Sequence, residues 1–279
     1  MTEFDRRKAV EAALAAADAA AVELMKRFRA PPGDVRAWLK APGAPVTDAD
    51  IASDRAIAAV LRKAEAPGVI VSEEGESRAA LEQGAGTDGL TWLIDPLCGT
   101  LAFRDGLAHW GVNIALRDAV SLELAVLSVP TAREVFVGVR GAGVAHNGTR
   151  MAPVPPRVPL SQAVVCVEID NGDQWPVQAA RVAPWAPKVG AINAYTSIAY
   201  PGVQLILGRL AALVVFRVAP VHVAATALIA QELGLRVTDT RGRPVDWSGN
   251  DELPEVVIGW PEQHAALVQA MKDSSTTPL

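Results

Sequence analysis

The stretch that decides the fold is TWLIDPLCGTLAF, residues 91–103. Its apolar run Trp92-Leu93-Ile94 is short and is followed by turn residues, a pattern that predicts a buried strand. Asp95 and Pro96 end that strand, and Cys98-Gly99-Thr100 form the turn that follows. A carboxylate at the end of a buried strand is a candidate catalytic or metal-binding group, and Cys98 stands where a second acid would complete the site.

Composition and charge limit the classes of protein to which this chain can belong. The chain has 279 residues, of which 50% are hydrophobic and 20% charged, so it can bury a sizeable core. The formal net charge is −5 with both signs spread along the chain, which gives no reason to expect nucleic-acid or membrane-surface binding. Two cysteines do not make a disulfide framework, and no segment has the order of a signal peptide or the length of a membrane span. We therefore expect a cytoplasmic protein.

Periodicity and turn residues predict alternating helices and strands. Helices are expected over residues 3–29, 48–65, 196–207, 222–234 and 261–272, the fourth of them amphipathic. Strands are expected at 68–72, 90–94, 110–117, 121–129, 134–139, 162–168, 210–218 and 255–259, with a hairpin over 142–151. A polar loop is expected over 73–89. This order favours a layered α/β or α+β sandwich as a single domain, 1–279, with two closely packed halves, about 1–155 and 156–272, and a frayed tail, 273–279.

Carboxylates recur at the ends of these elements. Glu73 and Glu74 follow one predicted strand, Asp95 follows another, and Asp50 lies at a helix start with the spacing of a capping box to Thr47. Acids gathered at one sheet edge bind hard cations such as Mg²⁺, and such ions hold phosphate and activate water. Taken singly, each group also has an ordinary structural interpretation as a cap, a turn or a solvated acid.

The motifs in their order resemble the inositol monophosphatase family of metal-dependent, lithium-sensitive phosphatases. The resemblance extends from about residue 46 to 260, and the Leu97 spelling of the central motif is closer to the 3'(2'),5'-bisphosphate nucleotidase branch. The segments that carry it are VTDAD, VSEE, WLIDPLCGT, VLSVPTAREVFVGVRGAGVAHNGTRM, VHVAATALIAQELG and GLRVTDTRGRPVDW. The resemblance implies a layered αβαβα sandwich of the inositol monophosphatase and fructose-1,6-bisphosphatase type, a homodimer, and Mg²⁺-dependent hydrolysis of a small phosphorylated substrate.

The resemblance also implies roles for individual residues. Glu73 and Asp95 match the ligands of the family's first metal ion, with the carbonyl of Leu97 as a further ligand. Asp50 and Thr100 match the pair that orients the attacking water, and Glu73 belongs to the same catalytic group. Gly99 and Thr100 match the turn that binds phosphate.

The departures from the family pattern concentrate on its second metal site. Cys98 replaces the second Asp of the central motif, and His222 replaces the Asp of the late motif. In one interpretation the second ion is lost, because Mg²⁺ selects oxygen ligands and two carboxylates are missing. In the other, Asp95, Cys98 and His222 form a site for Zn²⁺ or Fe²⁺. We favour the first. Phe216 lies where many inositol-specific members carry an acid, which argues against inositol monophosphate as the substrate.

Three functional classes follow from this site. The first is an enzyme that hydrolyses a small sugar, inositol or nucleotide phosphate with a reduced or recast second metal site and weak ordinary Mg²⁺-dependent activity. The second is an inactive protein that binds a phosphorylated ligand, and the third is a repurposed transition-metal enzyme. A cysteine-phosphatase loop, in which Cys98 is the nucleophile and Arg104 binds phosphate, also fits the letters C-x5-R but is the least favoured alternative.

Overall fold

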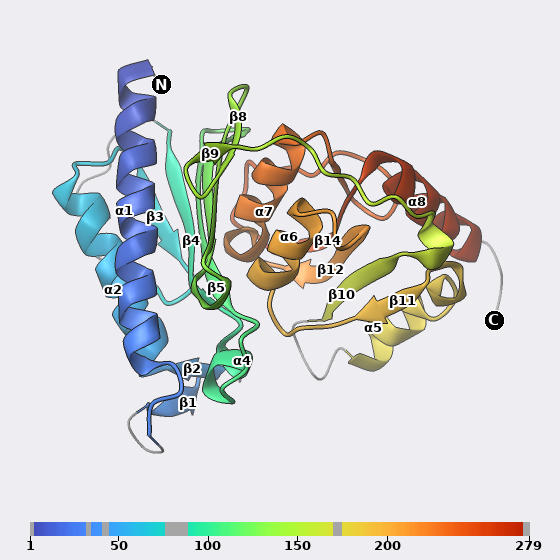
Figure 1. The fold of residues 1–279 in the computed structure, drawn as a ribbon, viewed down its shortest axis with the longest axis horizontal. Coiled ribbons are helices and arrows are strands. Elements are labelled where there is room, and N and C mark those ends of the chain that lie inside the picture. The colour runs from blue at the N-terminus through green and yellow to red at the C-terminus, as the bar shows by residue number, and fades with distance from the viewer. Residues whose placement is uncertain (1–2, 32–34, 41–44, 76–88, 170–174, 276–279) are drawn as a thin grey trace.

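The computed structural model describes residues 3–31, 35–40, 45–75, 89–169 and 175–275. Its helices and sheets form five layers, visible from left to right in Figure 1. The helices α1 (Glu3–Arg27) and α2 (Asp48–Lys63) form the first layer. The fold is therefore the αβαβα sandwich that the sequence predicts.

The second layer is a seven-stranded sheet in the order β3-β4-β5-β6-β7-β8-β9, in which only β3 and β4 are parallel. Its strands are β3 (Val69–Ser72), β4 (Thr91–Cys98), β5 (Gly111–Arg117), β6 (Leu122–Val129), β7 (Glu134–Val139), β8 (Gly143–His146) and β9 (Thr149–Arg150). Nearly every residue of β4, β5 and β6 is buried, because helices cover both faces of this part of the sheet.

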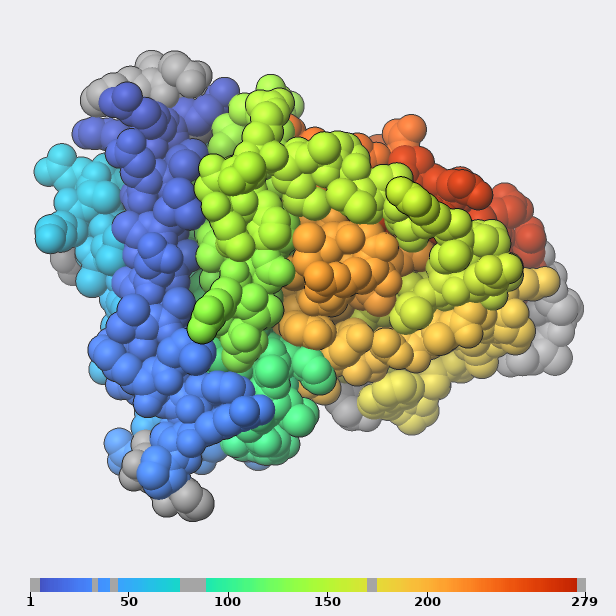
Figure 2. Space-filling view, viewed as in Figure 1, coloured from blue at the N-terminus to red at the C-terminus, as the bar shows by residue number. Residues whose placement is uncertain are grey.

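The third layer holds α6 (Ala199–Ile206) and α7 (Pro220–Glu232), which lie between the two sheets. The fourth is a five-stranded sheet in the order β11-β10-β12-β14-β13. Its strands are β10 (Val164–Ile169), β11 (Ala191–Asn193), β12 (Ala212–Val218), β13 (Arg236–Thr238) and β14 (Leu253–Gly259). The fifth layer holds α5 (Trp175–Val182) and α8 (Pro261–Ser275). The chain between β9 and β10 passes over α6 to connect the two sheets (Figure 2).

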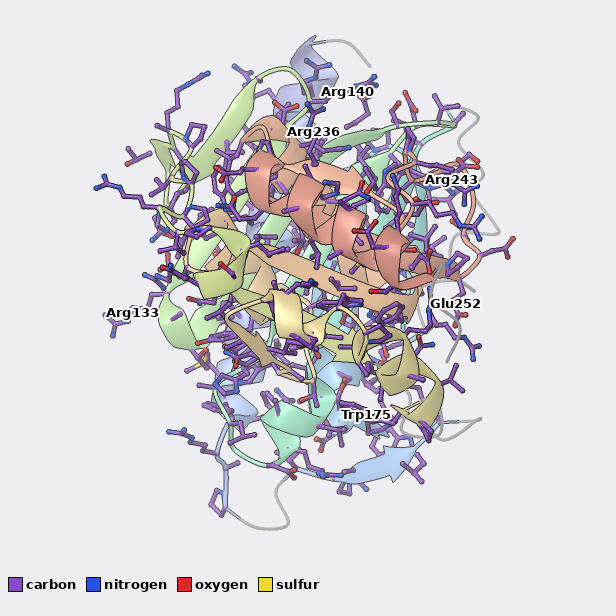
Figure 3. All side chains as sticks on the ribbon, turned by 90° about the vertical axis from the view of Figure 1, so that its right-hand side faces the viewer. Arg133, Arg140, Trp175, Arg236, Arg243 and Glu252 are labelled. Carbon is purple, nitrogen blue, oxygen red and sulfur yellow. The ribbon has the colours of Figure 1, made fainter. Side chains whose placement is uncertain are left out.

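Three clusters of buried side chains fill the spaces between these layers. One lies between α1, α2 and the first sheet, one surrounds α6 and α7, and one lies between the second sheet and the outer helices. Charged side chains such as Arg140, Arg236 and Glu252 extend from the surface of this body (Figure 3). Within the described residues, no helix is long and apolar enough to cross a membrane.

Two predicted features are wrong in detail. The helix expected to be amphipathic, α7, has buried residues around its whole circumference, because both sheets pack against it. The frayed tail was predicted to begin at residue 273, which is too early, because α8 continues to Ser275. Residues 276–279 lie outside the described residues. Most of the polar loop predicted over 73–89 also lies outside them.

Candidate metal and catalytic site

Asp95 lies at the point where β4 leaves its regular pairing with β5. The register of the two strands shifts between Asp95 and Cys98, so the chain turns sharply there. The Asp95 carboxylate is fully buried, and its Oδ1 accepts a hydrogen bond of 3.2 Å from the amide of Leu97. Ser53 on α2 donates a hydrogen bond of 2.7 Å to the carbonyl of Pro96. The turn is thus fixed both internally and by the first helix layer.

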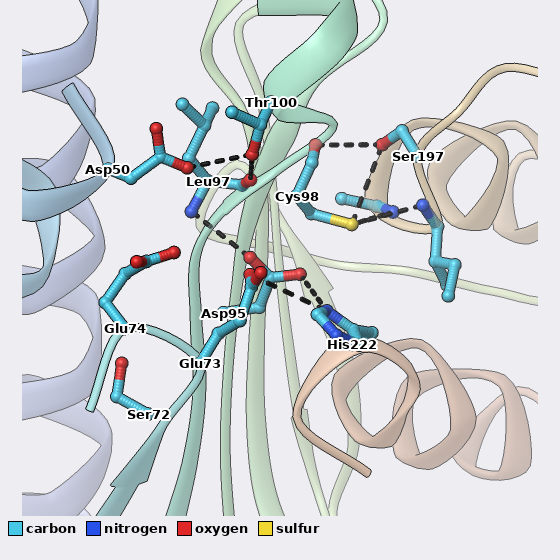
Figure 4. A network of polar contacts seen from close by, with 12 residues as sticks. Asp50, Ser72, Glu73, Glu74, Asp95, Leu97, Cys98, Thr100, Ser197 and His222 are labelled. Carbon is cyan, nitrogen blue, oxygen red and sulfur yellow. Dashed lines mark hydrogen bonds and ion pairs between the residues drawn. The ribbon is translucent and has the colours of Figure 1, made fainter. Parts of the chain in front are cut away.

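His222 reaches Asp95 from the second half of the chain. It occupies the first turn of α7, which begins with Pro220 at a position that suits the fixed φ of proline. Its Nδ1 lies 2.6 Å from Asp95 Oδ2 and 3.9 Å from Glu73 Oε2 (Figure 4). Ligand atoms of these three residues all lie within 4.8 Å of one another, close enough to hold one metal ion.

Two further carboxylates and a lysine lie beside this group. Lys40 Nζ donates hydrogen bonds of 2.9 Å to Glu73 and 2.6 Å to Glu74. Burial and the neighbouring Asp95 raise the pKa of Glu73 well above its usual range, and burial raises the pKa of Glu74 to about 7. Burial acts against the charge of Lys40, but the two glutamates hold its pKa above the ordinary value. Burial therefore opposes the ionised form of both glutamates, and the Lys40 ammonium favours it.

Asp50 and Thr100 form a second pair next to the metal group. Asp50 is the third residue of α2, and its Oδ2 accepts hydrogen bonds from the Thr47 amide, 2.8 Å, and hydroxyl, 2.6 Å, as the capping-box spacing predicts. Its Oδ1 accepts a hydrogen bond of 2.8 Å from Thr100 Oγ1. Burial raises the pKa of Asp50, which these hydrogen bonds oppose. Asp50 is therefore both the acidic member of the capping box, whose N-cap is Thr47, and the acceptor for the Thr100 hydroxyl.

Gly99 permits the close turn between Asp95 and Thr100. Its φ of +104° lies in the left-handed region, and a Cβ there would meet the carbonyl oxygen of His109 at 2.8 Å and Ser197 Cβ at 2.9 Å. The short helix α4 (Thr100–Arg104) begins directly after it. Gly99 and Thr100 are placed as the sequence predicts, at the start of a helix beside the acidic group.

Cys98 does not join the group around Asp95, which corrects the predicted Asp95, Cys98 and His222 cluster. Its sulfur accepts hydrogen bonds from the amides of Ile198, 3.1 Å, and Ala199, 3.3 Å, at the start of α6 (Figure 4). Burial, followed by the charge of Asp95, raises the pKa of the thiol. The group that the described residues do assemble contains Glu73, Asp95 and His222, with no sulfur. This geometry fits Cys98 as a buried side chain.

The cysteine-phosphatase alternative is also not supported by the geometry. A nucleophilic cysteine needs a lowered pKa, whereas that of Cys98 is raised. Arg104, the residue that would bind phosphate, is instead paired with Asp105 at the surface, with a distance of 2.7 Å between Nε and Oδ1.

Phe216 lies on the face of β12 that packs toward the outer helices, beneath the guanidinium of Arg181, and so faces away from α7.

Three contributors to the site were not predicted from the sequence. Lys40 is a single basic residue in a loop, and nothing in its spacing indicates that it contacts Glu73. The amides of Ile198 and Ala199 carry no side-chain signal at all. The Ser197 hydroxyl, which donates a hydrogen bond of 3.0 Å to the Cys98 carbonyl, lies in a segment without a recognisable motif.

Known proteins similar to this chain agree in family and fold. A model of the inositol monophosphatase family matches residues 5–276. The Nus factor SuhB of Pseudomonas aeruginosa is 36% identical over 205 residues, 71% of this chain and 73% of that protein. The inositol-1-monophosphatase of Rhizobium meliloti is 35% identical over 128 residues, 46% of each chain. The crystal structure of the extragenic suppressor protein suhB from Bartonella henselae has the same fold, with a TM-score of 0.82 at 23% identity, covering 94% of this chain and 97% of that one.

Proposed function

The chain belongs to the inositol monophosphatase family, and from this premise we propose that it hydrolyses a small phosphate monoester with one divalent metal ion held by Glu73, Asp95 and His222. The observation that carries the proposal is the convergence of these three side chains next to the Asp50–Thr100 pair. It places a cation site beside a proton acceptor, with groups from α2, α7, β4 and the end of β3.

The residues present fit a divalent ion. Two carboxylates and an imidazole are suitable ligands, and burial, followed by the charge of Asp95, raises the pKa of Glu73, a shift that a bound cation would oppose. Without sulfur in the group, the preference for a soft metal is weaker than the sequence alone indicates. Mg²⁺ prefers a set of three carboxylates to a set of two oxygens and one nitrogen. The set present here therefore suits Mn²⁺, Zn²⁺ or Fe²⁺ better than it suits Mg²⁺. When bound, the ion would neutralise charge on the phosphate and lower the pKa of water.

The chain's own groups would position the water and accept its proton. Because Thr100 Oγ1 donates its hydrogen to Asp50, the lone pairs of this oxygen are available to accept a hydrogen bond from water. As the water oxygen forms its bond to phosphorus and the ester bond breaks, the water proton passes to Thr100 and the Thr100 proton to Asp50, while the leaving oxygen takes up a proton from solvent and departs as the alcohol. Burial of Asp50 makes its carboxylate a stronger base than an exposed aspartate.

The amides at the start of α4, after Gly99, would bind the phosphate oxygens. The first amides of a helix lack partners within the helix, and the turn at Gly99 directs them beside the Thr100 hydroxyl. The substrate would therefore lie between this turn and the metal group.

Metal analysis and phosphate release test the proposal together. We expect protein purified without added metal to retain about one Mn²⁺, Zn²⁺ or Fe²⁺ per chain, and to release phosphate from a sugar, inositol or nucleotide phosphate. Asp95→Asn should abolish both properties, whereas Asp105→Asn, at an exposed aspartate that follows the end of α4, should change neither. A folded wild-type protein that binds no divalent ion and releases no phosphate would reject the enzyme.

A second candidate is a binding role in transcription without turnover. It is favoured by the similarity to a protein named Nus factor SuhB and by the substitution of two family carboxylates, at Cys98 and His222. It is distinguished by Asp95→Asn, because a binding role that does not need the metal would survive this change while phosphate release would not.

A further inference from the structure

Glu168 is a buried acid outside the candidate site. It lies near the end of β10 and is 5% exposed. Its Oε1 accepts a hydrogen bond of 2.7 Å from the amide of Tyr195, and its Oε2 accepts one of 3.0 Å from the amide of Thr196. The thiol of Cys166, on the same strand, donates a further hydrogen bond of 3.2 Å to Oε1. The carboxylate therefore holds the segment that leads from β11 into α6.

This segment contains a strained residue. Thr196 has a φ of +55°, in the left-handed region that β-branched residues rarely adopt. A residue keeps such a conformation only where its surroundings hold it there. The hydrogen bond from the Thr196 amide to Glu168 is one such restraint, and a carboxylate is a stronger acceptor than a neutral group. Glu168 therefore helps to set the path of the chain just before Ser197.

The residues that follow hold the turn at Cys98. Ser197 Oγ donates a hydrogen bond of 3.0 Å to the carbonyl of Cys98. The amides of Ile198 and Ala199 donate to its sulfur, at 3.1 Å and 3.3 Å. A Cβ at Gly99 would lie only 2.9 Å from Ser197 Cβ, so the turn and this segment are in close contact, as Figure 4 shows for Ser197 and Cys98. The position of the turn thus depends on the position of the segment.

From this chain of contacts we infer that Glu168 is a positioning residue for the turn at Cys98 and Gly99. It acts through residues 195–199, which hold Cys98 and thereby fix the amides at the start of α4. The inference rests on the proposed function in one respect, which is that these amides bind the phosphate of the substrate. Glu168 would then align the phosphate from the second half of the chain without touching it.

Separate measurements of phosphate and metal binding test the inference. Glu168→Gln replaces one accepting oxygen by an NH₂ group, so one of the two amides loses its acceptor. By calorimetric titration in saturating Mn²⁺, inorganic phosphate should bind this variant about tenfold more weakly than wild type. KM for a phosphate ester should rise by a similar factor, while kcat changes less, because the binding of phosphate is weakened throughout the reaction.

Affinity for Mn²⁺ alone should stay within about twofold of wild type in Glu168→Gln, because the hydrogen bonds of Glu168 go to β10 and to residues 195–196. Glu123→Gln is the matched control. Glu123 is a glutamate of β6 that is 7% exposed and accepts a hydrogen bond of 2.8 Å from Arg140. Its replacement should change neither phosphate nor metal affinity. Unchanged phosphate affinity in Glu168→Gln, or an equal loss of Mn²⁺ affinity, would overturn the inference.

A double-mutant cycle with Ser197→Ala tests the route. This change removes the hydroxyl that holds the Cys98 carbonyl. If Glu168 acts through residues 195–199, the loss of phosphate affinity in the double variant should be smaller than the product of the two single losses. Losses that multiply would show that Glu168 and Ser197 act separately, which would also overturn the inference.

Amide hydrogen exchange distinguishes a failure of the inference from a failure of the proposed function. The amides of Ile198 and Ala199 bond to Cys98 and not to Glu168, and we expect them to exchange about tenfold faster in Glu168→Gln than in wild type. This measurement needs neither metal nor phosphate. Faster exchange in a protein that binds no phosphate would reject the proposed function and support the positioning of the turn by Glu168. Unchanged exchange would overturn the inference whatever the activity.

Discussion

His222 Nδ1 and Asp95 Oδ2 lie 2.6 Å apart although 127 positions separate the two residues in the chain. The contact joins α7, which belongs to the second half, to the end of β4 in the first. The candidate site therefore exists only when both halves are folded and packed, and its metal preference depends on residues from each.

His222→Ala is expected to remove the nitrogen ligand and leave Asp95 with one fewer hydrogen-bond donor. Affinity for Mn²⁺ or Zn²⁺ should fall by at least about tenfold, and the free energy of unfolding by about 1–3 kcal/mol. Metal titration and chemical denaturation measure the two effects. His146→Ala, in the hairpin of β8 and β9, should leave metal affinity unchanged. Equal metal affinity in both variants would show that His222 is not a ligand.

Cys98→Asp combined with His222→Asp is expected to create or raise Mg²⁺-dependent phosphate release, by about tenfold or more. Carboxylate oxygens are the ligands that Mg²⁺ prefers, and the amides of Ile198 and Ala199 can accommodate an acceptor at position 98. His222→Asp alone should produce most of this gain, because Cys98 is not part of the group that could hold the ion. A folded double variant that stays inert in Mg²⁺ would show that a carboxylate at position 222 does not improve the metal site at Asp95.

Thr100→Val removes the hydroxyl that donates to Asp50 while keeping a similar shape. Phosphate release should fall by roughly 10²–10⁴-fold, the usual contribution of positioned proton transfer. The free energy of unfolding should fall by only about 1 kcal/mol, because Asp50 keeps both hydrogen bonds from Thr47. Thr149→Val, an exposed threonine in β9, is the matched control. Unchanged turnover would exclude the proton path through Thr100.

Lys40→Met is expected to increase affinity for a divalent ion by roughly tenfold or more. The ammonium group lies 2.9 Å from Glu73, where its charge opposes that of a bound cation. Calorimetric titration with Mn²⁺ measures the change. Lys26→Met, which removes an exposed ammonium from a glutamate on α1, should leave the affinity as it is. Weaker binding in Lys40→Met would mean that Lys40 supports the site instead of competing with the ion.

Glu168 should make the stability of the fold depend on pH. Burial raises its pKa from an ordinary 4.5 to about 7, opposed by hydrogen bonds from the amides of Tyr195 and Thr196. Between these two values the folded chain holds a proton that the unfolded chain loses, so the free energy of unfolding falls as pH rises from 4.5 to 7, by up to about 3 kcal/mol. Chemical denaturation at several pH values in this range should show that the free energy of unfolding depends less on pH in Glu168→Gln than in the wild type. Glu65→Gln, at an exposed glutamate, should retain the wild-type pH dependence.

Much of the fold could be predicted because its strands are continuous apolar runs bounded by turn residues. The elements missed are short or exposed, such as β1 (Ala37–Leu39), β11 and α5, in which burial leaves no periodic pattern. The mistaken amphipathic character of α7 has the opposite cause. A helix enclosed by two sheets has no solvent-facing side, and its small alanines carry little directional signal.

The sequence predicted which residues belong to the site more completely than it predicted how their side chains are arranged. The approach of His222 to Asp95 and the contact of Asp50 with Thr100 agree with what the family resemblance implies, whereas the resemblance assigns Glu73 and His222 to different metal sites and the structure brings them into one group. The direction of the Cys98 side chain does not follow from the resemblance, because it depends on the bulge in β4 and on amides that lie 100 and 101 positions further along the chain. Neither feature is encoded in the residues next to Cys98.

The enclosure of α7 between the two sheets has a consequence for how such a site can change over evolutionary time. Because packing on all sides fixes the helix, the Cα atom of His222 keeps its place relative to Asp95 whatever side chain it carries. Descendants of one ancestor could then acquire different ion preferences through single exchanges at this position, with no remodelling of the backbone around it.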